Sequence, residues 1–205
     1  MKILYATKNS AKFATMKIAL KDLKNIELIN LFDMKGDIPL VEENGRTPLE
    51  NAKIKAAAYF EVYNMPVFSC DSGLYFDNVP ESFQPGVFVR RPQGKELSDE
   101  EMIDYYSNLA IKFGILKAKY KNAICFIYNK NAIFSSDDDV LSGNNFIITS
   151  IPHKKGVKGF PLDCLSVNEK NEYYYDTNIK VDDINTKKGF EKFFKESLEK
   201  IKNIT

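Results

Sequence analysis

Apolar and polar positions along this chain of 205 residues follow patterns that predict both strands and helices. Residues 1–6 form a mostly apolar run, which is typical of a strand. A polar turn at residues 7–12 follows. The next apolar residues recur at helical spacing: Phe13, Met16, Ala19, Leu20 and Leu23. The chain is therefore expected to open with a strand, a turn and a helix.

A second helix has the clearest start signal. Thr47 is a favoured N-cap, Pro48 suits the first helical position, and Glu50 lies three residues after the cap. We expect the hydroxyl and the carboxylate to satisfy N–H groups reciprocally. The helix should end near Asn64, because Pro66 follows. Its predicted buried face consists of Leu49, Ala52, Ala56, Tyr59, Phe60 and Tyr63.

Shorter patterns organise the rest of the chain. Apolar runs predict strands at 66–70, 123–128, 132–134 and 146–151, with a further short strand expected at 173–175. Ser98 should cap a helix, and another amphipathic helix is expected from Gly189 onward. Residues 75–97 are expected to be rich in loops. No linker or repeat interrupts the chain, so we predict one domain, 1–205, of the mixed α/β or α+β class.

Composition narrows the class of protein. The net charge is +1, which argues against a nucleic-acid binder that captures its partner electrostatically. No apolar run approaches the roughly 20 residues that span a membrane. The first residues enter a strand without a signal-peptide pattern. Three cysteines without a pairing pattern favour a reducing compartment. We therefore expect a cytoplasmic enzyme that binds neither membranes nor nucleic acid.

Candidate chemistry is concentrated around the second helix. Glu43 precedes it, Lys55 lies within it, and Asp71 follows the strand at 66–70. Two carboxylates and a lysine can hold a metal ion against a polyphosphate, and Mg²⁺ prefers such oxygen ligands. Each residue also has a plainer interpretation. Asp71, Ser72 and Gly73 could end the strand in an ordinary turn, and Lys55 could be a solvated helix lysine.

The opening turn offers a second candidate site. A strand, a polar turn and a helix N-terminus form an anion site, because N–H groups and the helix dipole point at the turn. Lys8 and Lys12 add positive charge there. Many α/β proteins open in this way, so the pattern alone is weak.

Five blocks of the sequence, in order, resemble the inosine triphosphate pyrophosphatase family. Thr7-x-Asn9-x-x-Lys12 is similar to the family's T-G-N-x-x-K, and Asp71-Ser72-Gly73-Leu74 is similar to the end of D-D-S-G-L. The block from Glu43 to Lys55 resembles E-T-G-x-T-F-x-E-N-A-x-x-K. Two later blocks resemble P-G-x-x-S-x-R and G-x-x-G-F-G-Y-D-P: Pro85-Gly86-Val87-Phe88-x-x-Arg91 and Gly156-x-x-Gly159-Phe160-x-x-Asp163.

The resemblance implies a Mg²⁺-dependent pyrophosphatase that converts a non-standard purine nucleoside triphosphate, such as that of inosine or xanthosine, to the monophosphate and pyrophosphate. It implies an elongated mixed sheet flanked by helices, two lobes around a central cleft, and a homodimer. Glu43 would hold the metal, and Asp71 would act as metal ligand, general base or both. Lys12 and Lys55 would stabilise the charge that builds up in the transition state. The implied substrate contacts are Thr7, Asn9, Lys12, Lys55, Ser72, Phe160, Asp163, Lys187 and Lys188.

The sequence departs from the family at several positions. Cys70 replaces the first aspartate of D-D-S-G-L, and a small core residue is the plainer interpretation of it than a catalytic thiol. The family's S-H-R-G motif has no clear copy. Its nearest match is residues 186–189, where Lys187 and Lys188 could only donate hydrogen bonds and could instead be solvated. His153, the only histidine, is expected to be exposed.

Several alternatives remain open at this stage. Phe160 could be a core residue, and Asp163 could cap a turn. A Maf-like nucleotide pyrophosphatase has a related fold and different substrates. A nucleotide-binding protein without turnover is another possibility, for which Cys70 is the main reason. A nucleic-acid binder would show steep salt dependence.

Overall fold

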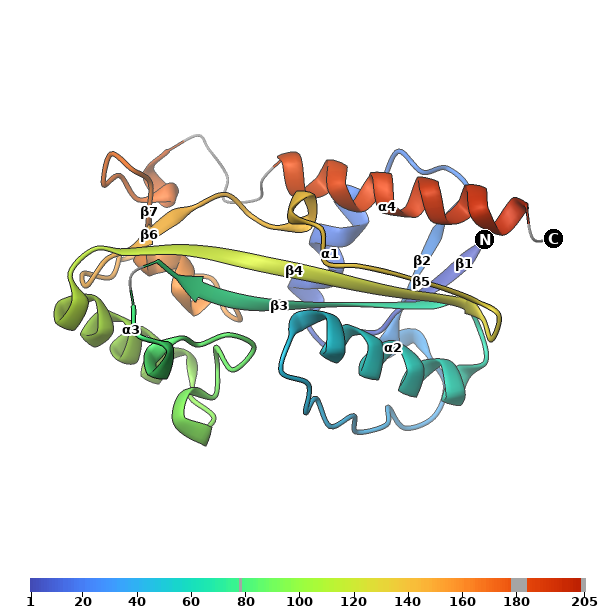
Figure 1. Cartoon of the computed structure of the whole chain (residues 1–205), viewed down its shortest axis with the longest axis horizontal. Helices are drawn as coiled ribbons and strands as arrows, with labels where there is room; N and C mark the ends of the chain where they lie inside the picture. Colours follow the sequence, from blue (N-terminus) through green and yellow to red (C-terminus); the bar gives the residue numbers. More distant parts are fainter. Residues whose placement is uncertain (78, 178–183, 204–205) are drawn as a thin grey trace. The chain divides into compact units, whose positions relative to one another are not determined.

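A computed structural model describes residues 1–77, 79–177 and 184–203 of the chain. In these residues the α-helices are α1 (Ser10–Ala19), α2 (Pro48–Tyr63), α3 (Asp99–Phe113) and α4 (Ile184–Lys202). The strands are β1 (Lys2–Tyr5), β2 (Glu27–Asn30), β3 (Val67–Phe76), β4 (Leu116–Asn129), β5 (Ala132–Ser136), β6 (Phe146–Ile148) and β7 (Ser166–Val167) (Figure 1). The mixed α/β class is thereby confirmed.

The chain divides into two compact units, which are described separately. The first unit contains Met1–Ser72, Lys121–Ser142 and the segment from Ile184 onward, and the second contains Gly73–Tyr120 and Gly143–Asp183. Strands β3 and β4 each contribute residues to both units. Neither unit is therefore a continuous stretch of sequence, which agrees with the absence of a linker.

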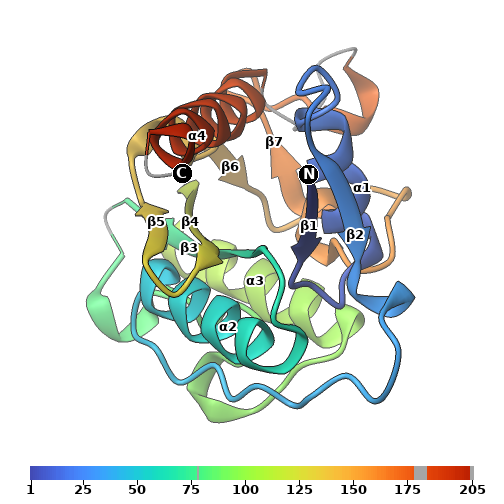
Figure 2. The ribbon, with the colours of Figure 1, turned by 90° about the vertical axis from the view of Figure 1, so that its right-hand side faces the viewer.

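The first unit is built on a sheet of strand order β2-β1-β3-β4-β5. Strand β1 is parallel to both of its neighbours, whereas β5 returns antiparallel along β4. Helices α1 and α4 cover one face of this sheet, and α2 covers the other (Figures 1 and 2). The alternation of side chains along β3 explains both layers, because successive residues of a strand point to opposite faces.

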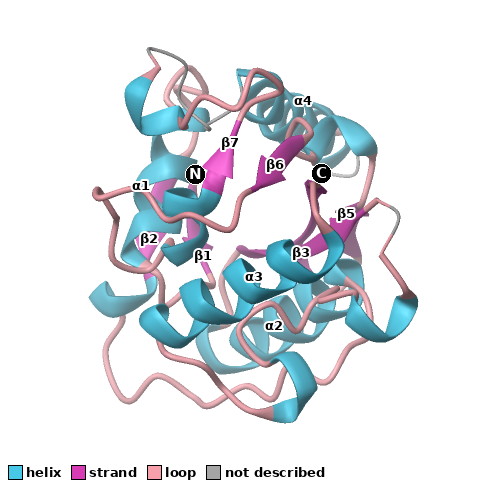
Figure 3. Ribbon diagram, turned by 90° about the vertical axis from the view of Figure 1, so that its left-hand side faces the viewer, coloured by secondary structure: helices cyan, strands magenta, loops and turns pink. Residues whose placement is uncertain are grey.

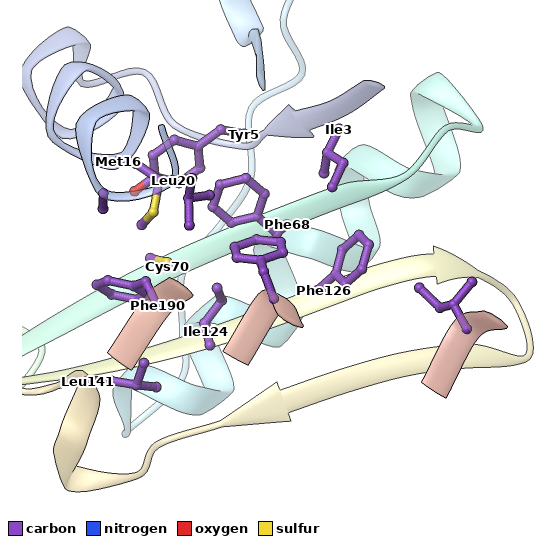
Figure 4. Close-up of a cluster of buried hydrophobic side chains, with 13 residues drawn as sticks. Ile3, Tyr5, Met16, Leu20, Phe68, Cys70, Ile124, Phe126, Leu141 and Phe190 are labelled. Atoms are coloured by element: carbon purple, nitrogen blue, oxygen red, sulfur yellow. The ribbon is translucent and has the colours of Figure 1, made fainter. Parts of the chain in front are cut away.

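The core beneath α1 and α4 is aromatic. The ring of Phe68 on β3 stacks on Tyr5 at 4.4 Å between centroids (Figure 4). It meets Phe194 of α4 edge-on at 5.0 Å. Phe126 on β4 adds a further ring 5.5 Å from Phe194. Such pairs contribute energy beyond their buried area, so this cluster is expected to hold α4 firmly on the sheet.

The second unit combines the remaining parts of β3 and β4 with β6 and β7, and β4, β6 and β7 are antiparallel neighbours. Helix α3 is labelled in Figure 3. Its buried residues Met102, Tyr106 and Leu109 belong to the hydrophobic core of this unit. The predicted cap at Ser98 is confirmed, and it is a capping box, since Ser98 and Glu101 satisfy each other's N–H groups.

Several predicted element boundaries were wrong. Strand β3 does not stop at Asp71 but continues to Phe76, where it pairs with β4 and forms a further bridge between Leu74 and Gly86. Strand β4 begins at Leu116 rather than at 123. Residues 174–176 form a 3₁₀ turn instead of a strand, and α4 begins at Ile184 rather than at Gly189. Strands β2 and β7 were not predicted.

None of the helices in the described ranges has the length and apolar character that crossing a membrane would require.

Candidate active site

Asp71 lies within β3, and its side chain points toward α2. The carboxylate is buried, with 8% of the residue exposed. Asn51 Nδ2 donates a hydrogen bond to its Oδ2 at 3.1 Å, and Lys55 Nζ lies 3.5 Å from its Oδ1. Asn51 and Lys55 are one helical turn apart, so one face of α2 holds this carboxylate. The interpretation of Asp71 as an ordinary turn residue was therefore wrong.

Lys55 joins Asp71 to a second carboxylate. Its Nζ lies 2.7 Å from Glu43 Oε2, and only 14% of the lysine side chain is exposed. The ammonium thus sits between two carboxylates that come from different parts of the first unit. The alternative of a solvated helix lysine is excluded by this geometry.

Asn51 links the loop that carries Glu43 to the strand that carries Asp71. Its Oδ1 accepts a hydrogen bond from the backbone N–H of Gly45 at 2.8 Å, while its Nδ2 donates to Asp71. A Cβ atom on Gly45 would lie only 2.6 Å from that Oδ1, so the loop approaches α2 as only glycine allows. We did not predict this role for Asn51, although its spacing from Lys55 was a signal for it.

The start of α2 is capped as predicted, with one difference. Thr47 Oγ1 accepts from the N–H of Glu50 at 3.2 Å. The carboxylate of Glu50 accepts from the N–H of Arg46 at 2.6 Å and not from that of Thr47. The cap therefore also ties down the residue that follows the Gly45 loop.

The N-terminus of α1 is less open to an anion than the pattern predicted. Asn9 is the N-cap, and its Oδ1 accepts from the N–H groups of Ala11 and Lys12 at 2.9 and 3.1 Å. Thr7 Oγ1 accepts from the N–H of Asn9 at 3.2 Å. Two of the N–H groups expected to face an anion are thus engaged. The side chain of Asn9 could donate a hydrogen bond to an anion only through its Nδ2 amide.

Lys12 belongs to the same charged cluster as Lys55. Burial lowers the pKa of Lys12 below the usual 10.5, and the charge of Asp71 opposes this effect most strongly. The charge of Lys55 lowers the pKa further, while Glu43 raises it. We therefore count Lys12 with Lys55, Glu43 and Asp71 as one charged cluster, because the charges of all three act on it.

Cys70 faces the opposite side of β3 from Asp71. It lies in the core cluster with Ile124 and Phe190 (Figure 4). Burial raises the pKa of its thiol to about 12, although Lys12 and Lys55 act in the other direction. The thiol is therefore neutral at physiological pH, which confirms the interpretation as a core residue and gives no support to a catalytic thiol.

Two candidate residues lie in the second unit. Phe160 is half-buried and directly follows Gly159, whose φ is +86°. Asp163 lies in the 3₁₀ turn Pro161–Leu165, and its charge contributes to raising the pKa of Tyr120 and Tyr175, although burial is the larger cause for both. Phe160 is not among the residues of the described hydrophobic clusters, so the alternative of a core residue is disfavoured.

Three candidates remain in the first unit outside the charged cluster. Ser72 is half-buried on β3. Lys187 and Lys188 lie in the first turns of α4, where Lys187 is half-buried and Lys188 is exposed. Thr186 fixes this turn by donating a hydrogen bond to the carbonyl of Ser142 at 3.1 Å.

Two other expectations concern residues outside the cluster. His153 was expected to be exposed, but only 16% of its side chain is, and its Nε2 lies 3.3 Å from Asp176. The prediction was wrong because the residue packs between Tyr173 and Tyr175. Phe88 and Arg91, from the P-G-x-x-S-x-R block, line a cavity of about 400 Å³ within the second unit.

The donor set of the charged cluster fits a magnesium ion in kind. Glu43 and Asp71 offer carboxylate oxygens, and Mg²⁺ commonly takes one or two carboxylates together with phosphate oxygens and water. Within the described ranges, no group of three or more acidic, histidine or cysteine side chains converges as a metal cage. The pair therefore fits a metal that arrives with a phosphate substrate better than a metal held by protein alone.

Comparison with known proteins identifies the family. Residues 3–175 match the Ham1 family. A dITP/XTP pyrophosphatase of Malacoplasma penetrans is 34% identical over 140 residues, which cover 66% of this chain and 68% of that protein. The enzyme of the same name from Christiangramia forsetii is 31% identical over 169 residues, covering 80% of each chain.

Solved structures agree with this match. The Ham1 protein of Staphylococcus aureus superimposes with a TM-score of 0.71 at 22% identity, covering 96% of this chain and 99% of that one, which shows the fold. A HAM1 protein of Coxiella burnetii gives a TM-score of 0.69 at 25% identity, covering 100% and 98%.

Proposed function

Because this chain belongs to the Ham1 family, we propose that it hydrolyses non-standard purine nucleoside triphosphates, releasing the monophosphate and pyrophosphate. The family suggested by the sequence motifs is thereby confirmed. Two relatives carry the name dITP/XTP pyrophosphatase. The observation that best supports the proposal is the ammonium of Lys55 between Glu43 and Asp71, with Lys12 in the same cluster.

We propose that Glu43 and Asp71 hold Mg²⁺ through their carboxylate oxygens. Bound there, the ion would neutralise phosphate charge and lower the pKa of a bound water. Lys55 would then turn from the carboxylates to the phosphate oxygens, because the ion would neutralise the carboxylates in its place. Asn51 would keep Asp71 in place during this exchange, since its hydrogen bond does not depend on the lysine.

In the proposed reaction Asp71 acts as general base. It would accept a proton from a water molecule whose oxygen attacks the α-phosphorus, and the bond from that phosphorus to the bridging oxygen would break. Pyrophosphate would leave with the bridging oxygen. Lys12 and Lys55 would stabilise the charge that develops on the phosphate oxygens.

The remaining candidates are proposed to bind substrate. Thr7, Asn9 and Ser72 would donate hydrogen bonds to the phosphates. In the second unit, Phe160 would stack on the base and Asp163 would face its edge. Lys187 and Lys188, which can only donate, would suit a carbonyl oxygen such as that on C6 of inosine or xanthosine.

We further propose that the two units act as a single domain, that the protein forms a homodimer, and that it works in a reducing cytoplasm. The interlacing of the two units along the sequence supports the first point. Three free, buried cysteines support the last.

The test is pyrophosphate release from a panel of standard and non-standard nucleoside triphosphates, with Mg²⁺ and with chelator. Asp71→Asn and Glu43→Gln should each lower kcat by at least about 100-fold, because each removes charge at the reacting phosphate. Glu42→Gln is the matched control, since Glu42 is an exposed neighbour of Glu43. Its activity should equal that of the wild type.

Two outcomes would contradict the proposal. Nucleotide binding without release in Mg²⁺ would show a binding protein without turnover. Release that favours nucleotides other than inosine, deoxyinosine and xanthosine triphosphates would point to a Maf-like specificity instead.

A further inference from the structure

A hydrogen bond joins the start of α3 to the loop that carries Phe160. The backbone N–H of Gly159 donates to Asp99 Oδ2 at 3.1 Å. Both residues belong to the second unit, although they are far apart in the sequence. Neither the sequence motifs nor the proposed function uses Asp99.

The second oxygen of Asp99 is held by an arginine. Arg90 Nη2 donates to Asp99 Oδ1 at 2.7 Å, and its Nη1 donates to the carbonyl of Leu97 at 3.1 Å. Leu97 in turn donates its N–H to the carbonyl of Arg90 at 2.8 Å. The guanidinium is therefore fixed at both ends, and it leaves Asp99 little freedom to turn away from Gly159.

The charge on Asp99 is stabilised by the same contacts. Its pKa is lowered first by the hydrogen bond from Arg90 and next by the N–H of Gly159. A charged acceptor makes a stronger hydrogen bond to a backbone N–H than a neutral one does. The link to Gly159 is therefore maintained throughout the physiological pH range.

The hydrogen bond to Gly159 constrains the backbone conformation of the loop that carries Phe160. The N–H of Phe160 donates to the carbonyl of Val157 at 2.9 Å and closes a tight turn, in which Gly159 has a φ of +86°. Asp163 then donates its N–H to the carbonyl of Phe160 at 3.2 Å. Holding the Gly159 N–H thus fixes the Lys158–Gly159 peptide plane, and the Phe160 N–H bond to Val157 fixes the next one.

Phe160 depends on its backbone for its orientation. It is half-buried and, within the described residues, lies outside the hydrophobic cluster that contains most of the aromatic side chains of this unit. The rotamers open to such a ring depend on the backbone φ and ψ of its residue, so the conformation of the turn limits the directions that the ring can take.

We propose that Asp99, held by Arg90, is a positioning residue that fixes the Gly159 turn and thereby aims the Phe160 ring at the base of the nucleotide. This inference rests on the proposed function, in which Phe160 stacks on the base. Asp99 itself touches no substrate. Its loss should therefore weaken the hold on the base while leaving the phosphate chemistry intact.

A single tryptophan can report on this turn, because the chain contains none. Phe160→Trp places an indole at the position in question, and its anisotropy and its quenching by inosine triphosphate can be followed. Asp99→Asn and Arg90→Gln would be added separately to this background. The matched control is Lys95→Gln, which removes another ion pair at the start of α3, to Glu101, without touching Gly159.

We expect Asp99→Asn to lower the indole anisotropy and to weaken the quenching affinity by about threefold to tenfold, the effect of losing one hydrogen bond. Arg90→Gln should act in the same direction, and Lys95→Gln should change neither quantity. In the chain with Phe160, Asp99→Asn should raise KM by a similar factor and change kcat less than about twofold. If Asp99→Asn folds poorly, Arg90→Gln tests the same link.

Equal anisotropy, affinity and KM in Asp99→Asn, Arg90→Gln and Lys95→Gln would overturn the positioning role. A different result would identify an error in the proposed function. If inosine triphosphate quenches the indole in none of the proteins although pyrophosphate is released, Phe160 does not contact the base, and the link then has no bearing on the substrate.

Discussion

Asp71 and Cys70 are adjacent in sequence but serve different parts of the molecule. Asp71 points toward α2 and meets Asn51 and Lys55, whereas Cys70 points into the aromatic core on the other face of β3. A neutral thiol in place of the family aspartate removes one negative charge that would act on Lys12 and Lys55. The contacts of Asp71 with Asn51 and Lys55 are present beside it.

Asn51 offers a sharp test at the level of one residue. Asn51→Leu keeps a similar volume but leaves the Gly45 N–H and one oxygen of Asp71 without partners. Each buried unsatisfied group costs about 1–3 kcal/mol, so we expect a lower free energy of unfolding and a lower kcat. Urea denaturation would measure the first and pyrophosphate release the second. Asn44→Leu, at an exposed neighbouring position, should change both much less.

The pH dependence of activity should show the loss of the proton from the Lys12 ammonium. Burial lowers the pKa of this lysine below 10.5, so its ammonium loses its proton at a lower pH than an ordinary lysine does. The charged form is present below that pKa and disappears as the pH rises through it. If that charge binds phosphate, the alkaline limb of kcat/KM should begin below 10.5. Lys12→Arg should shift the limb upward, because arginine stays protonated. An unshifted limb would show that another group titrates.

The charged cluster could be predicted in part from the sequence. The cap at Thr47 places Lys55 in a helix, and the resemblance adds Glu43 and Asp71. The role of Asn51 could not be predicted, because it depends on the close approach of Gly45 and on a strand twenty residues later. Residues that act through tertiary contacts leave little trace in local patterns.

Among the elements, α2 and α3 were predicted well because both carry strong caps. Thr47 and Ser98 each accept a hydrogen bond from the N–H of the third helical residue. Such caps depend only on residues close in sequence, so they can be predicted from it. The course of β3 was predicted poorly. Asp71, Ser72 and Gly73 are typical turn residues, yet pairing with β4 and with Gly86 keeps the strand extended, so tertiary contacts override local preference.

The close contact between α4 and the backbone of Val140 leads to a prediction about this helix. A Cβ atom at Gly189 would collide with the backbone carbonyl of Val140, so the helix touches this segment directly. Gly189→Ala gains helix propensity but forces the helix outward. Overpacking costs about 1–3 kcal/mol, and we expect net destabilisation with altered selectivity among bases, since Lys187 and Lys188 move with the helix.

Thermal unfolding and the substrate panel would measure the two effects of Gly189→Ala. Gly156→Ala is the matched control for stability, because no atom lies within 4 Å of its Cβ position. Equal stability of the two variants would contradict the tight contact.

At the scale of the whole molecule, each unit draws on separated stretches of sequence. Strands β3 and β4 supply both cores, so each unit depends on segments that also stabilise the other. The hydrophobic pattern predicted a single domain but not this division. The division arises from which parts of two long strands each helix covers, and no local pattern contains that information.

The three cysteines can test whether the units unfold together. Cys70 and Cys125 lie in the first unit and Cys164 in the second, and burial raises the pKa of all three thiols. A thiol reagent at pH 8 should label none of them in the native protein. With increasing urea, we expect all three to become reactive at one midpoint. Labelling of Cys164 at a clearly lower concentration would show two independent domains.

The position of Lys55 between Glu43 and Asp71 also has a consequence for the order of assembly. Without a metal, both carboxylates are already paired with the Lys55 ammonium, so chelation should leave the folded protein intact. A free magnesium ion must compete with that ammonium and should bind weakly. A nucleotide offers the ammonium a new partner while it delivers the ion, so the two ligands should enter as one complex. We therefore expect Lys55 to release the two carboxylates only when the metal ion and the nucleotide bind together.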